Sequence, residues 1–202
     1  MKRDRGKKLV YVPEDVIDEI AEVSKKRGET ISRFVENSLR QAVRVDKAGF
    51  DVGQMADFFE VMQVSRVLGG VFVPLEVLNL LVKRAYGGEK KSLHEKWRES
   101  GTWHGKYLKE KFEDPVNAFK VFLEACRWDL NEVEVKHGGD SAKVMCVSST
   151  LTSEGTGLLA DFIEGAMYGM GFKLENKDVV RGMLILEFKL GSSGGSQPNR
   201  SA

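Results

Sequence analysis

The sequence predicts an α+β protein in two parts, and three features of the 202-residue chain lead to this prediction. Alternating residues before Pro13 are followed by two helical patterns that meet at Gly28, which predicts one strand and two helices. Apolar residues then keep a helical spacing as far as Cys126. After Asn131 the spacing becomes two, and strand-like segments flank one more helix. The C-terminal part should therefore pack helices on a small antiparallel sheet.

The strand of the first unit, residues 1–45, is expected to pair with its copy in a second chain. Side chains of a strand alternate between its faces, so one face carries Val10 and Val12. The other face carries Lys7, Leu9 and Tyr11. A lone strand leaves its backbone polar groups open on both sides. Pairing of two copies gives a two-stranded antiparallel ribbon.

Two helices should follow this strand. Pro13 suits the start of the first helix, which is expected to stop at Gly28 in a left-handed conformation. Thr30 is a natural N-cap for the second helix. The apolar side of that second helix consists of Ile31, Phe34, Val35, Leu39 and Val43. One strand and two short helices cannot bury this surface alone, which again favours a dimer.

Over about residues 7–44, the order strand, Pro13, helix, Gly28, Thr30, helix resembles the ribbon-helix-helix class of transcription regulators. The resemblance implies a homodimer whose ribbon enters the major groove of double-stranded DNA. It implies base contacts from Lys7, Leu9 and Tyr11, and phosphate contacts at Thr30, Ile31 and Ser32. Basic residues of the arm before the strand suit phosphates as well: Lys2, Arg3 and Arg5.

Composition limits the other classes of function. The net charge is +1, which is not that of a general polyanion binder, although residues 1–12 carry five basic residues and one acidic residue. Cys126 and Cys146 lack paired spacing, so we expect buried, inert thiols rather than a disulfide or a zinc site. The sequence shows neither the pattern of a signal peptide nor an apolar run long enough to span a membrane. We therefore expect a cytoplasmic protein without a membrane partner.

Residues 46–70 are expected to form a linking segment. The helix from Gln54 to Leu68 is apolar on more than one face, which indicates burial on two sides or a dimer contact. Domain 71–190 should then begin with a short strand at 71–73 and a helix after Pro74. Further helices are expected after the caps Ser92 and Asp114.

The second half of that domain should be mostly strands. Residues 132–136 and 143–149 form a predicted hairpin, and a helix should begin at Thr156. Two more strands are predicted at 172–176 and 183–190. Residues 191–202 are rich in glycine and serine and should be a disordered tail.

The stretches 99–135 and 155–188 resemble the 4-vinyl reductase small-molecule-binding domain, with an overall span of 71–190. The resemblance implies an apolar cavity that senses a small apolar ligand. Large rings and one histidine are the candidate ligand contacts: Trp103, His104, Tyr107, Phe122, Trp128 and Phe162. The alternative is that these rings fill the core. Cysteines common in the last hairpin of that family are missing here, so we expect no metal site.

Together these patterns predict a dimeric, sequence-specific DNA-binding transcription regulator with a ligand-sensing C-terminal domain. No nucleophile–base pair, phosphate loop or metal cluster is recognisable, so an enzyme is not expected, nor is a cofactor. One alternative makes the C-terminal domain only a dimerisation or docking module. A second is an antitoxin-like protein that does not read DNA, because Leu9 and Tyr11 replace the polar side chains usual in the ribbon. Whether dimers pair into tetramers is left open.

Overall fold

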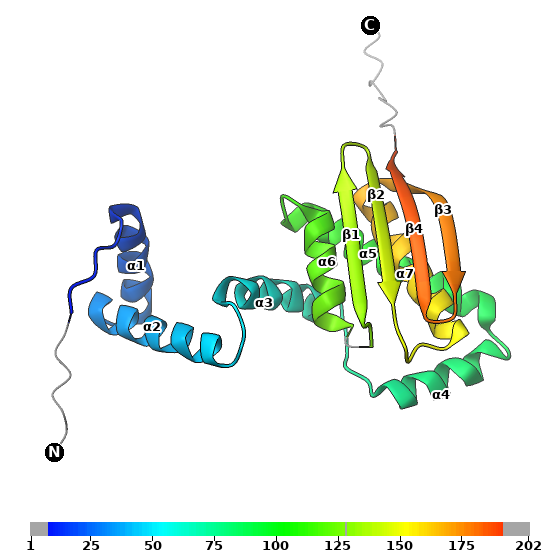
Figure 1. The fold of residues 1–202 in the computed structure, drawn as a ribbon, viewed down its shortest axis with the longest axis horizontal. Coiled ribbons are helices and arrows are strands. Elements are labelled where there is room, and N and C mark those ends of the chain that lie inside the picture. Colours follow the sequence, from blue (N-terminus) through cyan, green and yellow to red (C-terminus); the bar gives the residue numbers. More distant parts are fainter. Residues whose placement is uncertain (1–7, 128, 192–202) are drawn as a thin grey trace, which may run out of the picture. The chain divides into compact units, whose positions relative to one another are not determined.

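The computed structural model describes residues 8–127 and 129–191. Over these residues the chain is α+β, with seven helices and a four-stranded antiparallel sheet (Figure 1). It divides into two compact units, Met1–Met55 and Ala56–Ala202. The predicted α+β class with a small antiparallel sheet is confirmed.

The helices of unit 1 form as the sequence predicts. Helix α1 (Glu14–Arg27) follows Pro13 and ends at Gly28, which has a φ of 67° in the left-handed region. Helix α2 (Ile31–Lys47) is capped by Thr30, whose side chain accepts a hydrogen bond of 3.3 Å from the Arg33 backbone N–H. Both ends of the connection between α1 and α2 are therefore fixed by local sequence.

The predicted N-terminal strand is not formed in the single chain. From Lys8 to Pro13 the described backbone is neither helix nor strand. Leu9, Val10 and Tyr11 are 82%, 71% and 92% exposed. The physical reason is that a strand exists only through pairing, and unit 1 offers these residues only helices to lie beside. The ribbon, which needs a second chain, is therefore not shown and stays a prediction.

Unit 1 also lacks a core of its own. Ser24 is its single buried residue over the described positions, and no residue of α2 is buried. Leu39 and Val43, on the predicted apolar side of α2, remain 58% and 54% exposed. A 17-residue helix whose apolar side stays this open is stabilised by very little packing.

The five remaining helices lie in unit 2, apart from the first residues of α3 (Val52–Val67). The other four are α4 (Leu75–Tyr86), α5 (Lys90–Lys111), α6 (Pro115–Cys126) and α7 (Ser153–Met170). As predicted, Asp114 caps α6 by accepting a 2.9 Å hydrogen bond from the Asn117 N–H. None of the helices that the structure describes is long and apolar enough to cross a membrane.

Three predicted boundaries in this unit are wrong. Residues 71–73 form no strand. A strand needs a neighbour to pair with, and the described sheet contains only four other strands. Ser92 is not a cap, since α5 already begins at Lys90. Helix α7 begins at Ser153 rather than Thr156, because Thr152 caps it by accepting a 3.1 Å hydrogen bond from the Gly155 N–H.

Two adjacent hairpins build the sheet. Strands β1 (Glu132–Gly138) and β2 (Ser141–Val147) form the first, and β3 (Phe172–Val180) and β4 (Met183–Leu190) form the second. The order is β1-β2-β4-β3, with every pair antiparallel. Both hairpins were predicted, although β3 runs on to Val180. Gly182, with a φ of 75°, makes the turn into β4.

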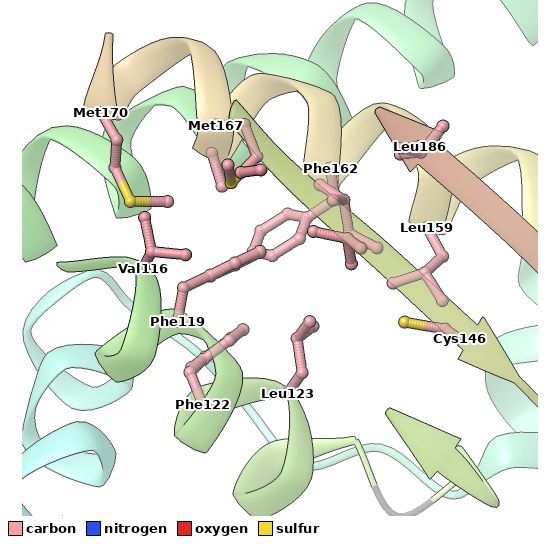
Figure 2. Packing of buried hydrophobic residues seen from close by; sticks show 14 of the residues in the cluster. Val116, Phe119, Phe122, Leu123, Cys146, Leu159, Phe162, Met167, Met170 and Leu186 are labelled. Atoms are coloured by element: carbon pink, nitrogen blue, oxygen red, sulfur yellow. The ribbon is translucent and has the colours of Figure 1, made fainter. Parts of the chain in front are cut away.

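Helices α5, α6 and α7 cover one face of this sheet and enclose the core with it (Figure 1). Phe119, Leu123 and Ile163 of the helices are fully buried, as are Leu186 and Phe188 of β4. Figure 2 shows part of this cluster, with Cys146 of β2 at its edge. The core of unit 2 is thus continuous between helices and sheet.

Candidate functional sites

The predicted DNA-binding residues fall into three groups. Lys2, Arg3, Arg5 and Lys7 lie outside the described residues. Leu9 and Tyr11 lie on the extended segment before α1 and are exposed. The structure brings the other three, Thr30, Ile31 and Ser32, together at the start of α2, where Ile31 is 41% exposed.

The start of α2 is electrostatically suited to an anion. Backbone N–H groups in the first turn of a helix lack carbonyl partners and carry a partial positive charge. The first turn of α2 has no acidic residue, whereas α1 begins with Glu14 and Asp15. The last turn of α1, with Lys25, Lys26 and Arg27, directly precedes this point. Near the start of α2, three basic side chains thus lie close in sequence, against one acidic residue, Glu29.

The predicted ligand residues are only partly brought together. His104 lies between two rings, with centroid distances of 5.2 Å to Phe122 and 5.1 Å to Phe162. Tyr107 packs beside the core, but Trp103 is 57% exposed and Lys106 lies over its ring. Trp128 lies outside the described residues.

His104 is held as a neutral core residue. Its Nδ1 donates a 2.9 Å hydrogen bond to the Ser100 carbonyl oxygen, and the residue is 7% exposed. Burial lowers the pKa of His104 and outweighs the opposing effect of that hydrogen bond. The imidazole is therefore uncharged at neutral pH.

The rings around His104 fill the space that they share. Phe122 stacks on Phe162 at 5.9 Å and on Phe119 at 6.0 Å, as the cluster in Figure 2 illustrates. A ligand that enters here has to displace at least one of these rings. In the described conformation these rings are core residues, as in the alternative stated from the sequence that they fill the core.

Sequence reasoning missed a polar network in unit 2. His94 of α5 lies with Nδ1 2.5 Å from Oδ2 of Asp161 on α7, and the Tyr86 hydroxyl of α4 lies 2.7 Å from His94 Nε2. Lys177 of β3 donates to Asp161 at 2.7 Å and to Glu164 at 3.1 Å. The network therefore connects α4, α5, α7 and β3.

We call Tyr86, His94, Asp161 and Lys177 the clamp, because their contacts hold four elements together. The pKa shifts in the clamp fit a structural role. Burial raises the pKa of Asp161, but the hydrogen bonds from Lys177 and His94 outweigh it and hold that pKa below its usual value of 3.8. Burial is also the main cause that raises the pKa of Tyr86, so its phenol stays neutral. A neutral phenol and a paired carboxylate supply no activated nucleophile.

A shallow hollow, open to solvent, lies beside this clamp. It is lined by Lys90, Lys91, His94, Glu95, Arg98 and Asp161. Arg98 is also bound, since its guanidinium lies 2.6 Å from Glu164. The hollow is lined by residues with ionisable side chains, and none of them is among the ligand contacts predicted from the sequence. One signal for the clamp was present: Asp161 interrupts the apolar run LLADFI, and a carboxylate in such a run needs a partner.

No protein-family model, curated protein or solved structure matches this chain. Over the described residues, no group of three or more His, Cys, Asp or Glu side chains could hold a metal ion. The two family resemblances therefore depend on residue patterns alone.

Proposed function

We propose that this protein is a homodimeric DNA-binding regulator of the cytoplasm in which the 8–12 segments of two chains pair as an antiparallel ribbon. One observation carries the proposal: unit 1 has two helices capped where they meet, at Gly28 and Thr30, but only Ser24 is buried over its described residues. Capped helices without a core are typical of a fold that is completed by a second chain.

The surface that a second chain would cover consists of apolar side chains from the extended segment and from both helices of unit 1. Val10, Val16, Leu39 and Val43 are large apolar residues of unit 1 that are at least 40% exposed. Burying a side chain of this kind is worth about 1.5–3 kcal/mol. The extended segment beside them presents unpaired backbone groups, which a partner strand satisfies.

In such a dimer, the ribbon face with Leu9 and Tyr11 is directed to the DNA. Lys7, by the strand alternation, shares this face and is the residue best suited to read a base edge. The start of α2, at Thr30, Ile31 and Ser32, binds a backbone phosphate through its free N–H groups. The arm with Lys2, Arg3 and Arg5 adds phosphate contacts.

Selection of genomic DNA fragments by the purified full-length protein tests this function. We expect enrichment of specific fragments, with binding that falls steeply as salt increases. In the variant with both Arg5→Ala and Lys7→Ala, affinity for the best fragment should fall about tenfold or more. Lys173→Ala removes a similar exposed charge from unit 2 and should change affinity less than twofold.

Two results would contradict DNA reading. One is recovery of fragments in proportion to their abundance. The other is equal affinity of wild type and the double variant. If the protein is still a dimer in either case, the antitoxin-like alternative is favoured, and the substitution of Leu9 and Tyr11 for polar residues explains the loss of DNA contact.

For unit 2 we propose a sensor of a small apolar ligand, which opens the ring cluster around His104 and thereby biases the DNA-binding dimer. The filled ring cluster favours a second candidate, a docking or dimerisation module. Thermal unfolding against fatty acids and aromatic compounds separates the two. A rise in Tm that continues with the logarithm of the ligand concentration supports the sensor. The absence of any shift supports the module.

A further inference from the structure

Helix α4 has two apolar faces, and unit 2 covers only one of them. Leu75, Leu78 and Val82 face the unit and are buried or half-buried. On the other side, Leu80 and Leu81 follow Val77 at spacings of three and four, which places these three residues on one helical stripe. Their side chains are 46% (Val77), 52% (Leu80) and 55% (Leu81) exposed, and Val73, which precedes the N-cap Pro74, is 41% exposed. We call Val77, Leu80 and Leu81 the outer stripe of α4.

The chain ends outside the described ranges are not suited to cover the outer stripe. The residues outside the described ranges at the two ends read MKRDRGK and SSGGSQPNRSA. The first is mostly charged, and the second is glycine, serine and other polar residues. Neither has the apolar side chains that would pack on a helix.

The charges beside the stripe match a second copy of the same helix. Glu76 lies in the first turn of α4 and Arg84 in its last turn, both exposed. Leu80 lies midway between them in sequence. When two α4 helices pack antiparallel about a two-fold axis at Leu80, each Glu76 meets Arg84 of the other copy. The opposite, parallel pairing would bring like charges together.

We propose that the outer stripes of two α4 helices pack antiparallel in the homodimer, with the two Leu80 side chains facing each other at the axis. This goes beyond DNA binding, although it rests on the homodimer of the proposed function. Three residues on one helical stripe make a contact smaller than a stable interface needs. Only residues 48–51 separate α2 from α3, a reach of about 14 Å, so pairing at unit 1 keeps the two copies of unit 2 at high effective concentration.

Cross-linking of the full-length Leu80→Cys protein tests this contact. Residues at a two-fold axis are close enough for a disulfide between the chains. The native thiols, Cys126 and Cys146, are half-buried and buried, and the wild type measures their background. Tyr168→Cys places a thiol at an exposed position of α7 as the matched control. We expect Leu80→Cys to form covalent dimer at least tenfold faster than Tyr168→Cys.

Charge reversal tests the antiparallel register. Adding Glu76→Arg to Leu80→Cys should slow cross-linking at least threefold, and adding Arg84→Glu as well should restore it. Light scattering on the same samples separates the two claims. A dimer in which Leu80→Cys reacts no faster than Tyr168→Cys overturns the α4 contact and leaves the proposed function standing. A monomer at micromolar concentration overturns the homodimer, and the α4 contact with it.

Discussion

His94 and Asp161 lie 67 positions apart in the chain, and Nδ1 of the histidine meets Oδ2 of the carboxylate at 2.5 Å. The contact joins α5 to α7, and the Tyr86 hydroxyl and Lys177 extend it to α4 and β3. The side chain of Asp161 is 10% exposed. A carboxylate this buried is stable only with its partners in place.

Asp161→Asn should therefore lower the free energy of unfolding by about 2–3 kcal/mol, because Lys177 and His94 lose a buried ionic acceptor. Urea unfolding at neutral pH measures the loss. Asp178→Asn makes the same chemical change at an exposed position of β3 and should cost less than about 0.5 kcal/mol. Equal losses in the two variants would contradict the role of the clamp.

The stabilising effect of Asp161 should also depend on pH. Its pKa is lower in the folded protein than the ordinary value of 3.8, so the folded state favours the charged form. The stabilisation is complete above the unfolded-state pKa and is lost as the pH falls through the folded pKa. Wild type should exceed Asp161→Asn in stability at pH 6, and the difference should shrink below pH 4. A difference that stays constant between pH 6 and pH 3 would be inconsistent with this linkage.

Helices α5 and α7 approach each other backbone to backbone. A methyl group at Gly105 would overlap the carbonyl oxygen of Ala166, and one at Gly165 would overlap the carbonyl oxygen of Arg98. Gly105→Ala should therefore destabilise unit 2 by about 3 kcal/mol or more, since two helix backbones must separate. Gly88→Ala, at a position with open space, is the control and should be tolerated. Chemical denaturation that gives both variants the same midpoint would rule out this close packing.

The two thiols should be inert in the folded protein. Burial raises the pKa of Cys146 to about 12 and also raises that of Cys126. Because the thiolate is the reactive form, a disulfide reagent at pH 8 should modify Cys146 at least a hundredfold more slowly in native protein than in urea. Mass spectrometry of tryptic peptides identifies the modified residue. Rapid labelling of Cys146 without denaturant would show that β2 is not buried as described.

Local signals in the sequence were enough for most of the fold. Gly28, Thr30 and Asp114 marked helix ends through backbone conformation or capping, and the structure confirms each. Both hairpins followed from alternation alone. The ribbon could not be confirmed in one chain, because its strand requires a neighbour from outside the chain. Residues 71–73 were apolar enough for a strand, yet they have no strand to pair with.

The candidate sites were less predictable, for a different physical reason. Ring content suggested a cavity around His104, but composition does not reveal whether rings line a space or fill it. Asp161 and His94 come together only through the crossing of α5 and α7, which no local spacing encodes. Gly105 and Gly165 permit the close approach of the two backbones at this crossing, where any larger residue would overlap the facing helix.

The pairing of two chains through residues 8–12 is tested most directly by light scattering of the full-length protein at micromolar concentration. We expect a particle of twice the 22.6 kDa chain mass. Val10→Lys should convert it to single chains with a less helical unit 1, whereas Val180→Lys, at an exposed position of unit 2, should leave the dimer intact. A fully folded wild-type monomer, or a Val10→Lys protein that stays dimeric, would contradict the account.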